Sequence, residues 1–280
     1  MQTNDPETRL PLTRSIKLPI ALSVAICLLT AAVSLAGLVA TAEAYPNEEL
    51  IRAFLANDVV NLLVGLPILL LSLWLVRTQR LVGLLLWPGA LVYTVYNYLV
   101  YVLAMPPNAA FVVHLLLVTL GWLALSAVLA AIDLRTVAAL LSGRVPARLS
   151  GGVLSAFGAL FALRALIALI VPMSSGVPLP NADVALNTAD LLITPAWLLG
   201  GVLLWRRRAL GYSAGLALLF QACMLFVGLI VVLLLQPALT GAPLALVDIL
   251  VVAAMSMVAF VPFIRYLRGI RSVGLPVTPE

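Results

Sequence analysis

Long apolar segments separated by short polar breaks recur along the whole 280-residue chain. Each segment is about 20 residues long, the length that a helix needs to cross roughly 30 Å of hydrocarbon. A helix also satisfies its backbone hydrogen bonds internally, as lipid requires. The pattern therefore predicts an all-α, polytopic transmembrane helix bundle with about eight spans: 18–40, 58–76, 81–104, 109–132, 151–172, 188–205, 212–235 and 245–264.

The polar breaks between these spans are too short to hold a soluble domain with its own core. The predicted organisation is a cytoplasmic tail (1–17), a first four-helix half (18–132), a cytoplasmic interfacial loop (133–150), a second four-helix half (151–271) and a cytoplasmic tail (272–280). Composition agrees, because 64% of residues are hydrophobic and only 10% are charged, whereas soluble domains have about 25% charged residues. Any chemistry is therefore expected in or at the bilayer.

The basic residues indicate the orientation of the spans. All of them except Arg52 and Arg164 lie in alternate breaks or toward the two ends of the chain. Lys and Arg near span ends stay on the cytoplasmic side, so both termini are predicted to be cytoplasmic. The net charge of +5 then reflects this topology and contact of the cytoplasmic arginines with anionic lipid, rather than binding of nucleic acid.

The first span also has features of a cleavable signal peptide. Arg14 and Lys17 precede it, and small residues follow it at 40–44. Its apolar run is longer than the roughly 7–15 residues of a signal core, which favours a retained helix. Cleavage would leave seven spans, but Lys17 is the only lysine, so no lysine in the last span could form a retinal Schiff base.

The two halves share a pattern that suggests internal duplication. The second span of each half is preceded by an acidic loop, opens on an aspartate and contains a proline: Asp58 and Pro67 in one half, Asp190 and Pro195 in the other. A four-plus-four duplication would relate the halves by an axis along the membrane normal, as in some transporters. Convergence on a common apolar composition is the alternative.

In this topology every inward-running span begins with a polar or ionisable residue on the outer side. These residues are Asp58, Asn108 followed by His114, Asp190 and Asp248. A carboxylate at a helix N-terminus can cap free N–H groups and gains about 0.3–1 kcal/mol from the helix dipole. Capping would explain Asp58 and Asp190 without any ligand.

Other polar residues lie deeper in the spans. Asn61 is one helical turn below Asp58, and Asn97 shares a helix face with Tyr93 and Tyr101. Asn97 is expected to turn inward because an amide is costly in hydrocarbon. Tyr98 and Tyr101 are expected in the aromatic belt at the membrane interface.

Arg164 is the most informative residue, because the predicted span places it near the bilayer centre. An arginine there costs about 2.5–3.5 kcal/mol, so it should face the bundle and pair with Asp58, Asp190 or Asp248. We predict an outward-facing polar pocket with these binding residues: Arg164, Asp58, Asn61, Asn97, His114, Asp190 and Asp248. The alternative is a structural ion pair that holds helices together.

The sequence offers no convincing catalytic, metal or cofactor motif. Residues 211–215 read G-x-S-x-G, but they begin a helical span rather than a strand-to-helix turn. One histidine and two cysteines are too few for a typical zinc site or a disulfide framework. No catalytic residue, metal or cofactor is therefore predicted.

Two loops are also relevant to mechanism. Asn47, followed by Glu48 and Glu49, predicts the cap of a short outer helix that could cover the pocket. The loop 133–150 alternates apolar residues with arginines and is expected to lie along the cytoplasmic lipid surface.

Three classes of function fit these features. Transport of a small solute or ion through the predicted pocket is favoured, although the inner halves of the spans are poor in polar residues. The alternatives are a membrane-embedded enzyme or binding protein for an extracytoplasmic lipid-linked substrate, and a non-catalytic subunit with a membrane-protein partner. Usage rich in Ala, Leu and Arg and poor in Lys predicts a bacterial plasma membrane.

Overall fold

The computed structural model describes residues 10–176 and 178–271, and the helices within these ranges confirm the all-α fold. The elements are α1 (Lys17–Val39), α2 (Thr41–Ala44), α3 (Glu48–Val60), the π-helix η1 (Asn61–Gly65), α4 (Leu66–Arg77), α5 (Leu81–Ala104), α6 (Ala109–Ala131), α7 (Leu134–Leu141), α8 (Ala147–Ser175), α9 (Asn181–Trp205), α10 (Ala209–Thr240) and α11 (Leu246–Arg271). Eight stretches of described helix are long and apolar enough to cross a membrane, with α3, η1 and α4 forming one of them. The chain is a multi-pass membrane protein.

Several helices extend well beyond the predicted spans. The Asn47 side chain does accept a hydrogen bond from the Leu50 N–H at 2.9 Å, but the helix that it caps is not a separate one. It continues through η1 to Arg77. Likewise, α9 begins at Asn181 rather than at 188. The prediction that Asp58 and Asp190 open their helices is therefore wrong, because polar residues prolong each helix beyond its apolar run.

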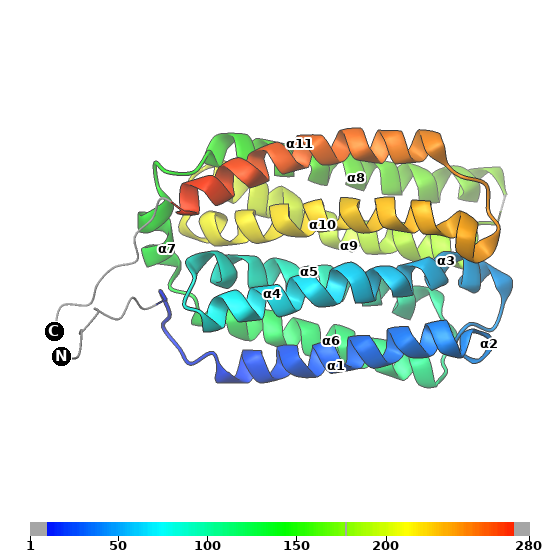
Figure 1. The fold of residues 1–280 in the computed structure, drawn as a ribbon. Coiled ribbons are helices and arrows are strands. Elements are labelled where there is room, and N and C mark those ends of the chain that lie inside the picture. Colours follow the sequence, from blue (N-terminus) through cyan, green and yellow to red (C-terminus); the bar gives the residue numbers. More distant parts are fainter. Residues whose placement is uncertain (1–9, 177, 272–280) are drawn as a thin grey trace.

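The helices form two groups of four that lie side by side (Figure 1). In the first group α1, α3 with α4, α5 and α6 pack in a ring, and α8, α9, α10 and α11 do the same in the second. The groups meet where α5 contacts α10 and α9, and where α10 contacts α3. The contact of α5 with α9 is matched by the contact of α10 with α3, which is the pattern that a two-fold axis would produce. The duplication itself remains a prediction.

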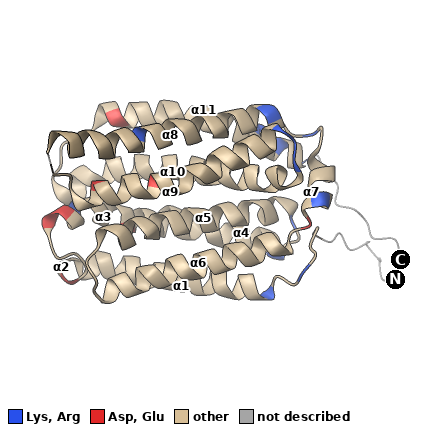
Figure 2. Ribbon diagram, turned by 180° about the vertical axis from the view of Figure 1, so that it is seen from behind, with Lys and Arg blue, Asp and Glu red and all other residues tan. Residues whose placement is uncertain are grey.

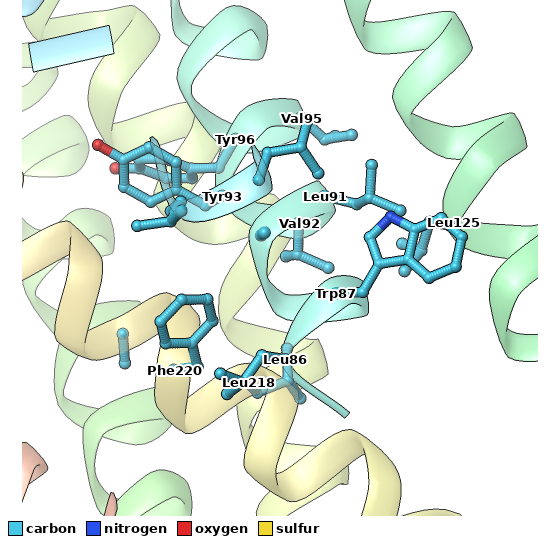
Figure 3. Packing of buried hydrophobic residues seen from close by; sticks show 14 of the residues in the cluster. Leu86, Trp87, Leu91, Val92, Tyr93, Val95, Tyr96, Leu125, Leu218 and Phe220 are labelled. Atoms are coloured by element: carbon cyan, nitrogen blue, oxygen red, sulfur yellow. The ribbon is translucent and has the colours of Figure 1, made fainter. Parts of the chain in front are cut away.

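Helix α5 forms the core of the bundle and is buried along nearly its whole length. Trp87 and Leu91 lie toward Leu125 of α6, while Leu86 packs against Leu218 of α10 (Figure 3). The Trp87 indole donates a hydrogen bond to the Ser23 hydroxyl of α1 at 3.0 Å. The central helix therefore carries the aromatic side chains that fix the positions of its neighbours.

Most charged residues lie toward the two ends of the bundle, with arginines mainly at one end and acids mainly at the other (Figure 2). We call the end at which α7 lies the arginine-rich end; it holds Arg77, Arg80, Arg135, Arg144, Arg148, Arg206, Arg207, Arg208, Arg265, Arg268 and Arg271. The acidic end, opposite, holds Glu43, Glu48, Glu49, Asp183 and Asp248. This separation is what the predicted orientation requires, and the side of the membrane that each end faces remains a prediction.

Helix α7 closes part of the arginine-rich end. The Asp133 side chain caps it by accepting hydrogen bonds from the Arg135 and Thr136 N–H groups, both at 3.1 Å. Val137 and Leu141 are buried, and α7 packs against α10. The predicted interfacial loop thus contains a short amphipathic helix held on the protein. Of the predicted tails, 1–9 and 272–280 lie outside the described residues.

Candidate functional site

A cavity of about 730 Å³ penetrates the bundle from the acidic end, and we call it the acidic-end cavity. Its walls come from α3, α5, α8, α9, α10 and α11, so it lies where the two helix groups meet. Asp183, Gln236 and Asp248 line it toward the helix ends, and Trp197, Ala222 and Phe226 line it deep in the bundle. Small-molecule sites typically measure about 300–1,000 Å³.

The cavity exists because α8 and α11 pack tightly only toward the arginine-rich end. All the buried residues of α11 lie between Ala259 and Ile270. In α8 every buried residue except Ala165 lies within 147–158. Two apolar residues of the cavity wall, Leu160 of α8 and Val251 of α11, are 50% and 52% exposed. The cavity therefore extends between the acidic-end parts of α8 and α11.

An ion pair between Arg164 and Asp190 lies in the cavity wall. The Arg164 Nη2 donates to the Asp190 Oδ2 at 2.5 Å, and the Tyr96 hydroxyl of α5 donates to the Asp190 Oδ1 at 2.7 Å. The guanidinium also lies 5.8 Å from the Phe161 ring centroid, within cation–π range. Of the three candidate acids, the structure selects Asp190 as the partner and confirms that Arg164 is paired.

The depth of the pair follows from α9. At 1.5 Å per residue, the helix between Asp190 and Trp205 is about 22 Å long. Because Trp205 immediately precedes three arginines, it marks the hydrocarbon boundary at the arginine-rich end. In a hydrocarbon layer about 30 Å thick, Asp190 then lies about 8 Å below the acidic-end boundary. This estimate puts the pair in the acidic-end half of the layer, and the position of Arg164 near the bilayer centre remains a prediction.

Amide and indole groups add polar contacts along the cavity. Asn97 is buried and lines it, as predicted, with its amide donating to the Tyr93 carbonyl at 3.0 Å. Deeper in, the Trp197 indole donates to the Gln221 Oε1 at 2.6 Å. Phe161 packs edge-on against Trp197, so the deep part of the cavity is mostly aromatic and aliphatic.

Asp58 belongs to a second polar group, which we call the Asp58 cluster and which comprises Tyr45, Asn57, Asp58, Asn61 and Tyr101. The Tyr45 hydroxyl donates to the Asp58 Oδ2, and the Tyr101 hydroxyl donates to its Oδ1 at 2.9 Å. Asn57 and Asn61 in turn donate to the Tyr101 hydroxyl at 3.2 and 3.4 Å. Burial and then the Asp58 charge raise the pKa of Tyr45, which keeps its hydroxyl protonated as the donor. Asp58 is only 1% exposed, so its carboxylate is enclosed, while Asn57 of the cluster also lines the acidic-end cavity.

The tyrosines of this region are not membrane-belt residues. Tyr98 and Tyr101 are almost fully buried, and the Tyr98 hydroxyl lies 3.4 Å from that of Ser34 in α1. The His114 ring of α6 stacks on Tyr98 at a centroid distance of 5.6 Å and is tilted by 45° to Tyr101 at 4.6 Å. The belt prediction was wrong because these side chains follow the inner face of α5 rather than its lipid face.

The predicted binding residues therefore divide into two sets. Arg164, Asn97, Asp190 and Asp248 line the acidic-end cavity. Asp58, Asn61 and His114 lie in or against the Asp58 cluster instead. Sequence reasoning did not single out Tyr96, Asn57 or Asp183 as site residues. Tyr96 could have been found from its spacing, since it is three residues after Tyr93 and so lies on the same face of the helix.

The serine of the G-x-S-x-G sequence and the histidine lie far apart in the described part of the chain. Ser213 is buried near the arginine-rich start of α10, whereas His114 lies near the opposite end of α6. Among the described residues, no group of three or more His, Cys, Asp or Glu side chains is placed to hold a metal ion.

Comparison of the chain with models of protein families, with curated proteins and with solved structures gives no match. The function must therefore be argued from the geometry of the acidic-end cavity.

Proposed function

We propose that this multi-pass membrane protein binds an amphipathic, lipid-like molecule in the acidic-end cavity. The observation that carries the proposal is the gradient of polarity along the cavity wall. Carboxylates line it near the helix ends, the Arg164–Asp190 pair lies below them, and aromatic and aliphatic side chains line the deepest part. A lipid in the same leaflet has its headgroup and chains in the same order.

The position of the cavity between α8 and α11 supports entry from the membrane. Leu160 and Val251 border the cavity and are half exposed, and we propose that a lipid enters between these two helices without leaving hydrocarbon. With the predicted orientation, the acidic end faces outward and the ligand comes from the outer leaflet of a bacterial plasma membrane.

Close packing near the arginine-rich end gives less support to transport of a small solute or ion. A Cβ added to Gly89 of α5 would overlap the Ala217 carbonyl of α10, and one added to Gly151 of α8 would overlap the Gly201 carbonyl of α9. Backbones this close leave no room for a solute between those helices. Transport therefore remains a prediction that would need these contacts to open.

Cavity-filling substitutions test the proposal. The detergent-solubilised protein would be titrated with three dioctanoyl lipids, namely phosphatidylethanolamine, phosphatidylglycerol and dioctanoylglycerol, and bound lipid counted by native mass spectrometry. We expect at least one to bind saturably, one per chain. Val252→Trp, which projects bulk into the cavity, should weaken that binding by about tenfold or more, because overpacking costs about 1–3 kcal/mol.

Val247→Trp is the matched control. Val247 lies on the same helix, is 73% exposed and does not line the cavity, so the same substitution there should leave binding unchanged. The proposal fails if none of the three lipids binds one-to-one, or if Val252→Trp binds as tightly as the unmodified protein.

A further inference from the structure

We infer that the ligand is a zwitterionic phospholipid, with its phosphate on Arg164 and its ammonium group near Asp183 and Asp248. The inference rests on the proposed function and specifies the headgroup that the cavity selects. It is carried by the charges of the cavity wall and by their order from the deep part to the mouth.

The charged side chains that line the cavity, among the described residues, are one arginine and three aspartates. Asp190 is neutralised by Arg164 at 2.5 Å and also accepts a hydrogen bond from the Tyr96 hydroxyl at 2.7 Å. Asp183 and Asp248 remain as an excess of negative charge, and both are exposed. A ligand with a net negative headgroup would be repelled by this rim, whereas an ammonium group would be attracted.

Arg164 nevertheless offers donors to an anionic group. The contact with Asp190 uses Nη2, and the arginine side chain is 47% exposed although it lies in the cavity wall. A guanidinium has five N–H donors in a planar fork, so the donors not directed at Asp190 can bind phosphate oxygens. The residue can therefore hold Asp190 and a phosphate together.

The depths of the charged side chains also match the order of the two charges in the headgroup. Asp183 lies in the first turn of α9, and the helix between it and Trp205 is about 33 Å long, which places it at the edge of a 30 Å hydrocarbon layer. Arg164 meets α9 lower down, at Asp190. Asp248 lies in the first turn of α11. Negative charge thus lies above the guanidinium, which matches a headgroup whose ammonium group is outside its phosphate.

Acyl chains are needed to cover the apolar part of the cavity. Ile193, Trp197 and Phe226 line its deep region, and Val252 and Met255 form the α11 side. A soluble phosphoamine would leave this surface uncovered, so the headgroup alone should bind far more weakly than the lipid. An anionic lipid would fill the same surface but would face the two rim carboxylates without a cation.

The lipid titrations described above, extended to charge variants, test the inference. The unmodified protein should bind dioctanoyl phosphatidylethanolamine about five- to tenfold more tightly than dioctanoyl phosphatidylglycerol, since partly exposed ion pairs contribute up to about 1 kcal/mol each. The double variant Asp183→Asn/Asp248→Asn should reduce this preference to about twofold or less. Arg164→Met should weaken both phospholipids relative to dioctanoylglycerol, which has no phosphate.

Glu43→Gln is the charge-matched control. Glu43 is exposed at the same end of the bundle but does not line the cavity, so its neutralisation should preserve the preference. Glycerophosphoethanolamine, the headgroup without chains, should not displace the lipid at equal concentration.

Three results would overturn the inference: equal or tighter binding of phosphatidylglycerol, a preference that survives in the double aspartate variant, and displacement by the chain-free headgroup. The first two results leave the proposed lipid binding standing as long as Val252→Trp still weakens it. Loss of the Val252→Trp effect would instead count against the proposed function itself.

Discussion

The ion pair between Arg164 and Asp190 should be asymmetric in its contribution to stability. The side chain of Asp190 is 10% exposed, whereas that of Arg164 is 47% exposed and open to the cavity. Arg164→Met leaves a buried carboxylate with only the Tyr96 hydroxyl as donor. Asp190→Asn keeps an oxygen for Tyr96 and leaves a guanidinium that the cavity can hydrate. Arg164→Met should therefore be the more damaging change.

The magnitudes follow from the same exposures. Removing one partner of a fully buried pair costs about 3–5 kcal/mol, and a hydrogen bond to a charged group contributes about 1.5–3 kcal/mol. Because Arg164 is nearly half exposed, solvent screening reduces the expected loss in Arg164→Met to about 1.5–2.5 kcal/mol. Asp190→Asn should lose less than about 1.5 kcal/mol, and the double variant less than the sum, with a coupling energy of about 1 kcal/mol.

The assay is a double-mutant cycle measured by reversible unfolding of the detergent-solubilised protein. Arg52 and Glu48 provide a control cycle, since they form an ion pair at 3.0 Å whose side chains are 65% and 84% exposed. That pair should couple by no more than about 0.5 kcal/mol. A coupling energy for Arg164 and Asp190 no larger than that of the control would refute the reasoning, as would greater damage from Asp190→Asn.

Two further predictions concern packing and capping. Gly89→Val should destabilise the bundle by about 1–3 kcal/mol or more in the same unfolding assay, because its side chain would meet the Ala217 backbone, whereas Ala254→Val on exposed α11 should change stability little. Hydrogen bonds from Thr136 lower the pKa of Asp133 below its ordinary value of 3.8, so the cap should stabilise α7 at neutral pH and lose this effect as the pH falls through the lowered pKa. Asp133→Ala should accelerate hydrogen exchange in α7 at neutral pH, after correction for intrinsic rates, and remove this acid dependence; unchanged exchange would contradict the capping role.

The number and class of the spans could be predicted from sequence because hydrocarbon thickness sets the length of each apolar run. The helix ends could not be predicted in this way, since hydrocarbon sets no limit on a helix that continues into water. Residues 48–57 extend the second span as a capped helix, and 181–187 extend the sixth. For this reason the sequence predicts Asp58 and Asp190 near helix N-termini, although each lies well inside a continuous helix.

The part of the site that follows from the energetics of a single residue could be predicted from sequence. The cost of an arginine in hydrocarbon required a partner for Arg164, and an acid was found. The choice of Asp190 over Asp58 depends on which helices are neighbours, and apolar periodicity does not contain that information. The same limit explains Tyr101, which sequence placed at the lipid interface and which instead binds Asp58 at 2.9 Å.

If the predicted duplication is correct, Asp58 and Asp190 are equivalent residues with different surroundings. Asp58 is enclosed by tyrosines, and Gly37 of α1 packs directly against its carboxylate. Buried residues are spaced along the whole of α1, so that half is closed over its acid. In the other half, α8 and α11 pack together only toward the arginine-rich end, and Asp190 meets an arginine beside open space. One half thus satisfies its acid internally, and the other leaves donors of Arg164 available to a ligand, which places the proposed lipid site beside the acid of the second half.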